Sequence, residues 1–239
     1  MAEIKRKTKK KSQGAFLRDS IMTGISYMIP VIVGAGVIQA IAKAMGGYDI
    51  GNHMDQIDTI AKAIMLLGQN MMNYVVPVIA AFIAYAMADK PGLAPGFVMG
   101  ALAGAINTGF VGGVVGGIMV GYFVLMLKKI KVPKAIQGIM PILVYPVVTT
   151  LVCGLLMYYV VGRPISWFMA WLTSGLMALS GGSRFVLGAV IGAMICLDHG
   201  GPINKTAALF VNGLNADGFL IPTSAKMCAG MTSPLGIGL

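Results

Sequence analysis

A run of 37 residues without a charged side chain, residues 91–127, limits what this chain can fold into. One helix of that length would measure about 55 Å, nearly twice the thickness of the hydrocarbon core of a bilayer. Two helices that are separated by a break near Asn107 and Thr108 fit the same stretch. The run therefore predicts two passes through a membrane.

The composition supports this interpretation. Apolar side chains make up 57% of the 239 residues and charged ones only 11%, whereas soluble domains carry about 25% charged residues. So little polar surface excludes a soluble enzyme and a disordered tail. We expect an all-α polytopic helical membrane protein with at least six spans, plus a re-entrant hairpin or broken helix near residue 200. The other predicted spans are 21–42, 63–88, 135–162 and 165–182.

The net charge of +10 is concentrated beside the apolar runs. Seven of the 18 basic residues precede residue 19, and four lysines lie within residues 128–134. Such clusters are typical of cytoplasmic segments that meet the anionic surface of a lipid bilayer. We therefore expect residues 1–20 to form a basic cytoplasmic tail and residues 21–239 to form the membrane domain. Nucleic acid is not an expected partner.

Glycine recurs at every fourth residue in two stretches, at 96, 100 and 104 and again from 109 to 121. This spacing places small residues on one helix face, where a second helix can approach closely. Ordinary tight packing is the interpretation we favour. A sliding or dimer surface is the alternative.

The segment around residue 200 is the candidate functional site. Residues 185–197 are apolar and would form about 20 Å of helix, which is too short to cross the bilayer. Two glycines and a proline follow, and these residues are typical of one helix end and the start of the next. The pattern predicts a break between two half-length helices. The candidate substrate-binding residues at this break are Asp198, His199, Gly200, Gly201, Pro202, Asn204 and Lys205.

An Asp or Lys at membrane depth costs roughly 2.5–3.5 kcal/mol, so these ionisable residues need a stabilising partner or a function. Two interpretations are open. One is an ion pair between Asp198 and Lys205 that stabilises the break, with His199 donating to a carbonyl. The other, which we favour, is a site for a polar solute such as a sugar, with Lys205 orienting Asp198. A carboxylate, a carboxamide and exposed backbone N–H groups can together satisfy several hydroxyls. No catalytic residue, metal site or cofactor is expected, because no corresponding motif is recognised.

Four stretches of the chain resemble motifs of a known family. They are Met22-Thr-Gly-Ile-Ser-Tyr-Met-Ile-Pro30, Ala84-Tyr-Ala-Met-Ala-Asp-Lys-Pro-Gly-Leu-Ala-Pro-Gly96, Gly138-Ile-Met-Pro-Ile-Leu-Val-Tyr-Pro146 and Asp198-His-Gly-Gly-Pro-Ile-Asn-Lys205. Together they resemble enzyme IIC, the membrane subunit of fructose-type permeases of the bacterial phosphoenolpyruvate-dependent phosphotransferase system. The resemblance extends from about residue 18 to the end of the chain.

The resemblance implies a transport function in the bacterial inner membrane. Such a subunit binds fructose or a related sugar outside, moves it with a transport unit against a dimeric scaffold, and presents it to a cytoplasmic IIB subunit. The phosphocysteine of IIB then phosphorylates the sugar. The implied partners are therefore IIB and IIA phosphocarriers and a second copy of the chain.

The resemblance also indicates what this chain lacks. Its three cysteines lie in apolar runs, so the phosphocysteine is expected on a separate subunit. The family continues to a Gly-Ile-Thr-Glu-Gly-Ala-Ile-Pro-like segment whose glutamate is expected at the sugar site. We therefore expect the chain to be truncated after Leu239. The alternative function is an ion-coupled secondary transporter that uses Asp198 as its ion site.

Overall fold

The computed structural model of the chain is built from helices. It describes residues 12–47, 50–52, 54, 57–130, 133, 137–178, 184–197, 207, 211 and 220–237, and these ranges contain no strand. The expected all-α class is therefore confirmed. The elements are α1 (Gln13–Gly46), η1 (Ile50–Asn52), α2 (Ile60–Asn73), α3 (Val75–Ala88), α4 (Lys90–Ala105), α5 (Gly109–Leu127), η2 (Met140–Val144), α6 (Tyr145–Leu156), η3 (Met157–Val161), α7 (Gly162–Ala178), α8 (Arg184–Leu197) and α10 (Ile221–Ile237).

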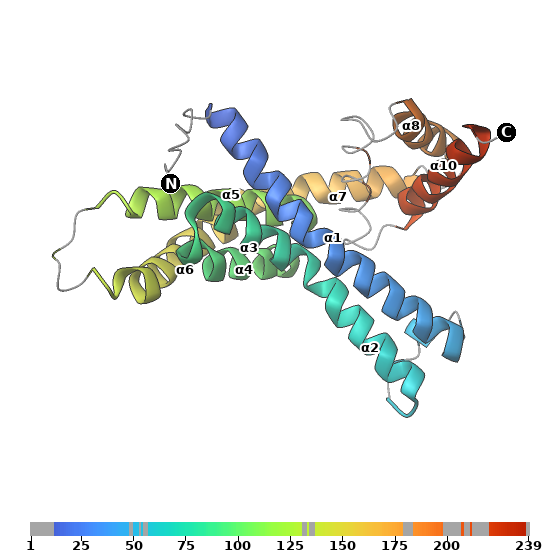
Figure 1. Cartoon of the computed structure of the whole chain (residues 1–239), viewed down its shortest axis with the longest axis horizontal. Helices are drawn as coiled ribbons and strands as arrows, with labels where there is room; N and C mark the ends of the chain where they lie inside the picture. Colours follow the sequence, from blue (N-terminus) through green and yellow to red (C-terminus); the bar gives the residue numbers. More distant parts are fainter. Residues whose placement is uncertain are drawn as a thin grey trace, which may run out of the picture.

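Helix α3 is the central helix of the bundle that it forms with α1, α4 and α5, while α2 packs against α1 (Figure 1). The helices α1, α4 and α5 all pack against it, and ten of its 14 residues are buried. Ile79 lies in an apolar cluster with Met28 of α1. Ala84 lies in a second cluster with Met99 of α4 and Val120 of α5. A helix buried on several sides must be apolar nearly all round, and α3 is.

Glycines allow the neighbouring helices to approach α3 closely. A Cβ atom added at Gly96 of α4 would lie 2.9 Å from the carbonyl oxygen of Ala80, and one added at Gly117 of α5 would lie 2.6 Å from the same oxygen. On the α1 side, a Cβ atom at Gly24 would lie 2.8 Å from the carbonyl oxygen of Ile79. Real Cβ contacts are not this short, so these positions use glycine for tight packing within the chain. Such packing was predicted for the glycine stretches of α4 and α5, and within them Gly104 is an exception, because a Cβ atom there would meet nothing within 4 Å.

The predicted break near Asn107 and Thr108 is confirmed. Helix α4 ends at Ala105 and α5 begins at Gly109. Asn107 and Gly109 have φ angles of 55° and 54°, in the left-handed region that asparagine and glycine accept most readily. The buried hydroxyl of Thr108 donates to the carbonyl oxygen of Ala103 at 2.9 Å. The backbone N–H of Thr108 donates to the same oxygen at 2.9 Å, so Thr108 caps the end of α4 with two hydrogen bonds.

Four segments of the described chain are long and apolar enough to cross a membrane. They are Gln13–Gly46, Ile60–Ala88, Gly109–Leu127 and Met140–Trp171. Helix α4 is not among them, because its 16 residues measure only about 24 Å. The expectation of at least six spans is therefore not confirmed by the described residues.

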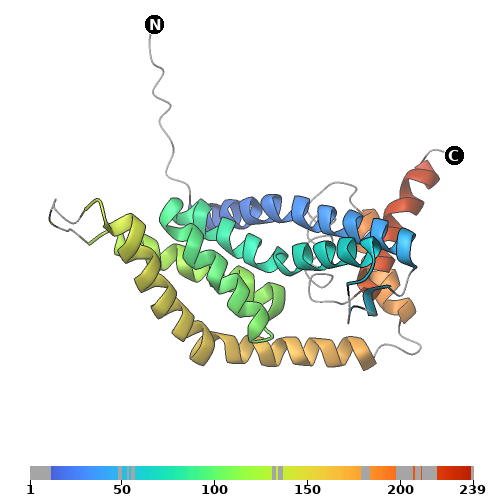
Figure 2. The ribbon, with the colours of Figure 1, turned by 90° about the horizontal axis from the view of Figure 1, so that it is seen from below.

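The two predicted spans 135–162 and 165–182 form one helical run in the structure, residues 140–178 (Figure 2). Its π-helical segment η3 ends where the N–H of Gly162 donates to the carbonyl of Met157, five residues earlier. Such widened turns are common sites of helix bends, and the helix continues through Pro164. Figure 2 shows the run bending between α6 and α7. The Gly-Arg-Pro sequence at 162–164 thus follows a bend rather than forming a loop between two spans.

Helices α8 and α10 form a smaller packing unit near the end of α7 (Figure 1). Ile191 and Ile195 of α8 lie in an apolar cluster with Ala229 of α10. Ala207 and Val211, which are also helical and buried, complete this cluster. The unit therefore has a core of its own.

Candidate functional site

All the predicted substrate-binding residues lie outside the part of the chain that the structure describes. They are Asp198, His199, Gly200, Gly201, Pro202, Asn204 and Lys205. Their contacts with a sugar, and the competing ion pair between Asp198 and Lys205, therefore stay predictions. The described residues define the elements on either side of them.

The helix before the motif has the length predicted for a half-helix. Helix α8 contains 14 residues, about 21 Å of helix, and begins one residue before the predicted segment. Its Ile191 and Ile195 share a cluster with Ala207 and Val211, the two described residues that follow the motif most closely. Residues that precede and follow the predicted break thus contribute to one apolar core.

An ion pair joins three helix ends at the start of the basic loop. Lys128, which follows α5, has its Nζ atom 3.1 Å from Oδ2 of Asp89 and donates to the carbonyl oxygen of Ala88 at 2.8 Å. A cation at this position also interacts favourably with the C-terminal end of the α3 dipole. Because the Asp89 side chain is 84% exposed, the pair contributes only about 0–1 kcal/mol. Its main consequence is geometric, since it brings the ends of α3 and α5 and the start of α4 together.

Asp89 also adopts an unusual backbone conformation, with φ 57° and ψ −157°. Residues other than glycine rarely occupy this region, and the strain costs about 1–3 kcal/mol. The following helix is pressed against α3, because a Cβ atom at Gly92 would lie 2.7 Å from the carbonyl oxygen of Ala84. The motif at 84–96 therefore builds a tight turn between two packed helices. The motif was recognised in the sequence, but this turn was not predicted from it.

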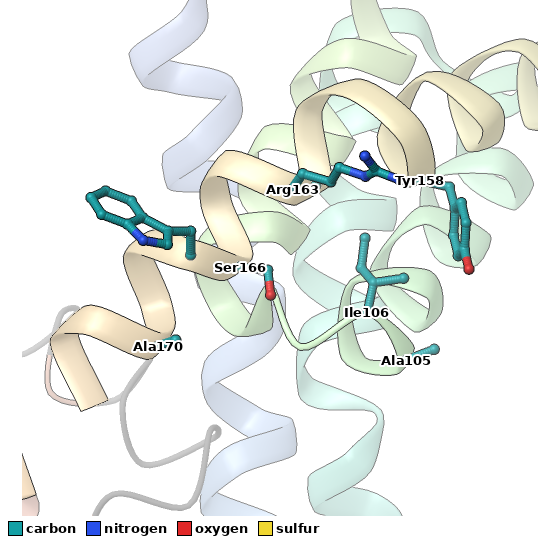
Figure 3. Close-up of a pocket in the computed structure, with 8 residues that line it drawn as sticks. Ala105, Ile106, Tyr158, Arg163, Ser166 and Ala170 are labelled. Atoms are coloured by element: carbon teal, nitrogen blue, oxygen red, sulfur yellow. The ribbon is translucent and has the colours of Figure 1, made fainter. Parts of the chain in front are cut away.

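A separate open cavity of about 550 Å³ lies where the α4–α5 turn meets the bend in the long helix (Figure 3). In Figure 3 the Arg163 side chain extends toward Tyr158, and Ser166 lies between the helix and Ile106. Arg163 is the only charged residue among those described as lining the cavity. This site was not predicted from the sequence. The available signal was an isolated arginine with tyrosines before it and tryptophans after it.

Comparisons with known proteins agree with the resemblance described above. The family model "Phosphotransferase system, EIIC" matches residues 22–239. A fructose-specific EIIB'BC component of Xanthomonas campestris pv. campestris is 48% identical over 92% of this chain and 38% of its own length. A fructose-specific EIIABC component of Bacillus subtilis is 38% identical over 92% of this chain and 35% of its own length.

A relative without an A or B label in its name also matches. The fructose-specific EIIC component of Haloferax volcanii is 36% identical over 93% of this chain and 65% of its own length. The chain thus spans about two fifths of the EIIB'BC relative and about two thirds of the EIIC relative. No solved structure matches the chain. Because the EIIC family model matches nearly all of its residues, the chain belongs to the EIIC family of the phosphotransferase system.

Proposed function

We propose that this chain is the sugar-translocating membrane subunit of a phosphoenolpyruvate-dependent phosphotransferase system. It imports fructose or a related sugar, which a separate IIB subunit phosphorylates. The observation that carries the proposal is the match of the EIIC family model to residues 22–239. The names of the relatives, which are fructose-specific components, support the substrate class. The long apolar helices support a role within the membrane.

The proposed sugar site is the break at Asp198 to Lys205, with Asp198, Asn204 and the Gly200-Gly201 backbone in contact with the substrate. The short helix α8 supports a break at this point. In one straight helix Ile191 and Val211 would be about 30 Å apart, so their membership of one cluster favours a chain reversal between them. A reversal at membrane depth needs partners for its backbone N–H and C=O groups. The hydroxyls of a sugar can supply them.

The proposed partners and orientation follow from charge and from the family. The names of the relatives combine C with B, or with A and B, which supports IIB and IIA phosphocarriers as partners. We assign the N-terminus to the cytoplasmic side of the bacterial inner membrane. The exposed Lys128 and Lys129 support this orientation, because short cytoplasmic loops are rich in lysine. A homodimer is proposed on the resemblance to the family.

The test is fructose uptake in bacteria that lack their own fructose permeases. The protein is expressed from its complete reading frame together with IIB and IIA. The double variant Asp198→Asn plus Asn204→Ala removes a charge and a carboxamide from the proposed site. We expect uptake to fall about tenfold or more, because each lost hydrogen bond to a buried polar group costs about 1–3 kcal/mol. Asn212→Ala is the matched control, because it removes a carboxamide outside the motif and should leave uptake unchanged.

Two outcomes would contradict the proposal. Undiminished uptake by the double variant, at equal amounts in the membrane, would remove Asp198 and Asn204 from the site. Unmodified sugar that accumulates with an ion gradient, without phosphoenolpyruvate, would indicate the alternative of a secondary transporter using Asp198. The comparisons do not favour that alternative, because the relatives named above are phosphotransferase components.

A further inference from the structure

The cavity beside the bend contains a cation, Arg163, that has no ion-pair partner among the described residues. Arg163 is exposed, and no carboxylate of a described residue lies within ion-pair distance of it. It interrupts the apolar helical run of residues 140–178. A charged side chain next to lipid is costly unless it finds a partner of opposite charge or reaches the membrane surface. A bound anion would therefore stabilise Arg163 at this site.

The length of α5 predicts that the cavity lies at the depth of a membrane surface. Its wall includes Ala105 and Ile106 at the α4–α5 turn. The 19 residues of α5 separate this turn from Lys128 by about 28 Å, which is close to the thickness of the hydrocarbon core. The cavity is therefore near the membrane face opposite the basic loop. Phosphate groups of lipids lie at this level.

Exposed aromatic side chains flank Arg163 on both sides. Tyr158 and Tyr159 precede it and are 53% and 59% exposed, and Trp167 and Trp171 follow it and are 73% and 63% exposed. Tyrosine and tryptophan are enriched where a protein meets the interfacial region of a bilayer. These aromatic side chains favour a lipid over a phosphate ion in solution as the ligand. A lipid can pack its acyl chains against this apolar surface, whereas a free ion makes no favourable contact with it.

We propose that this cavity binds the phosphate of an anionic phospholipid headgroup. The guanidinium of Arg163 donates to two phosphate oxygens, for which its planar fork is well suited. The hydroxyls of Ser166 and Tyr158, which line the same cavity, donate to the remaining headgroup oxygens (Figure 3). The volume of about 550 Å³ is ample for a phosphoglycerol group. The acyl chains extend along the exposed aromatic surface. A headgroup held here links the bend of the long helix to the bilayer surface.

The two tryptophans of the chain, Trp167 and Trp171, offer a local test. Trp171→Phe leaves Trp167, which lines the cavity, as the only fluorescent indole. The full chain with this substitution is reconstituted in phosphatidylcholine vesicles that contain brominated phosphatidylglycerol or brominated phosphatidylcholine. We expect phosphatidylglycerol to reach half-maximal quenching of Trp167 at an about tenfold lower mole fraction, as charge-assisted hydrogen bonds would produce.

Variants of Arg163 then identify the group responsible. Arg163→Gln should abolish the preference for phosphatidylglycerol, and Arg163→Lys should retain much of it. Lys129→Gln removes an exposed cation at the other end of α5. It should keep the preference for phosphatidylglycerol that the Trp171→Phe protein, the parent in this experiment, shows. Circular dichroism checks that the helical content of each variant is unchanged.

Three results would overturn the proposal. They are equal quenching by the two lipids in the parent, an unchanged preference in Arg163→Gln, and a loss of the preference in Lys129→Gln. Inorganic phosphate provides a further arm. If phosphate alone changes Trp167 fluorescence in an Arg163-dependent way while the two lipids quench equally, the ligand is a soluble phosphate. The quenching experiment does not depend on sugar transport, so its result is independent of the result of the uptake test.

Discussion

The close approach of α4 to α3 predicts different effects on stability for the same substitution at two glycines one helical turn apart. A Cβ atom at Gly100 would overlap Cα of Pro77 and would lie 2.6 Å from the carbonyl oxygen of Val76. That distance is about 0.8 Å short of the 3.4 Å at which ordinary contact begins. The atoms in the way belong to the α3 backbone and cannot rotate aside. At Gly104 an added Cβ atom would meet nothing within 4 Å.

Gly100→Ala should therefore lower the free energy of unfolding relative to Gly104→Ala by about 1–3 kcal/mol, the usual cost of overpacking. Both variants gain helix propensity from alanine, and the gain is larger at the interior position 100 than near the helix end at 104, so propensity cannot explain a lower stability of Gly100→Ala. For a chain of this size the difference corresponds to about 2–4 °C in thermal midpoint per kcal/mol. The control is matched in residue type, helix and substitution.

Cys153 provides the assay, because it is only 2% exposed and lies in the cluster that contains Met99 of α4. Replacing Cys196 and Cys228 by serine leaves it as the only thiol. A thiol-reactive fluorogenic dye then reports when the packing of α4, α5 and α6 opens during heating in detergent. Equal midpoints for Gly100→Ala and Gly104→Ala would refute the reasoning, because the glycines would then not be required by helix contact.

Three further predictions concern polar groups. Lys128→Met should lower stability in the same assay by about 1 kcal/mol, because it removes the pair with Asp89 and a hydrogen bond to the end of α3; an unchanged midpoint would contradict this. Thr149→Val should raise the thermal midpoint, because the fully buried Thr149 hydroxyl has no hydrogen-bond partner among the described residues. Removing it relieves a desolvation cost of about 1 kcal/mol or more. A lower midpoint would show that the hydroxyl is hydrogen-bonded. The Lys62 ammonium, 2.8 Å from Asp58, holds the pKa of that carboxylate below its usual 3.8. The stabilisation by the ionised Asp58 is therefore fully present above its unfolded pKa of 3.8 and is lost as the pH falls through its lower pKa in the folded protein. The thermal midpoints of the parent and of Asp58→Asn should therefore converge in acid. A difference in midpoint that stays constant with pH would contradict the assignment.

Local features were predictable where a residue type has one dominant use. Asn107 and Thr108 interrupt an apolar run that is too long for one helix, and the structure has its break there. The four-residue glycine spacing predicted close helix contact, which Gly96 and Gly117 make with Ala80. The end of the apolar segment at 197 coincides with the end of α8.

Other features depend on which parts of the chain meet. The sequence Gly-Arg-Pro at 162–164 suggested a boundary between two spans, but the widened turn of η3 carries the helix through it as a bend. Lys128 was predicted only as part of a basic loop, and its pairing with Asp89 arises because α3 and α5 end side by side. The cavity at Arg163 combines a turn near residue 106 with a helix that begins more than thirty residues later.

The amino-acid sequence by itself determined that this chain is a helical membrane protein, where several helices end, and to which family it belongs. These properties follow from hydropathy, local backbone preference and short motifs, each of which acts within a few residues or along one helix. The tertiary structure alone decided that α3 is the central helix, that Lys128 holds three helix ends together, and that Arg163 lines a cavity in which no other described residue is charged. These features require distant segments to come together, and that depends on the packing of whole helices rather than on any residue's own preference.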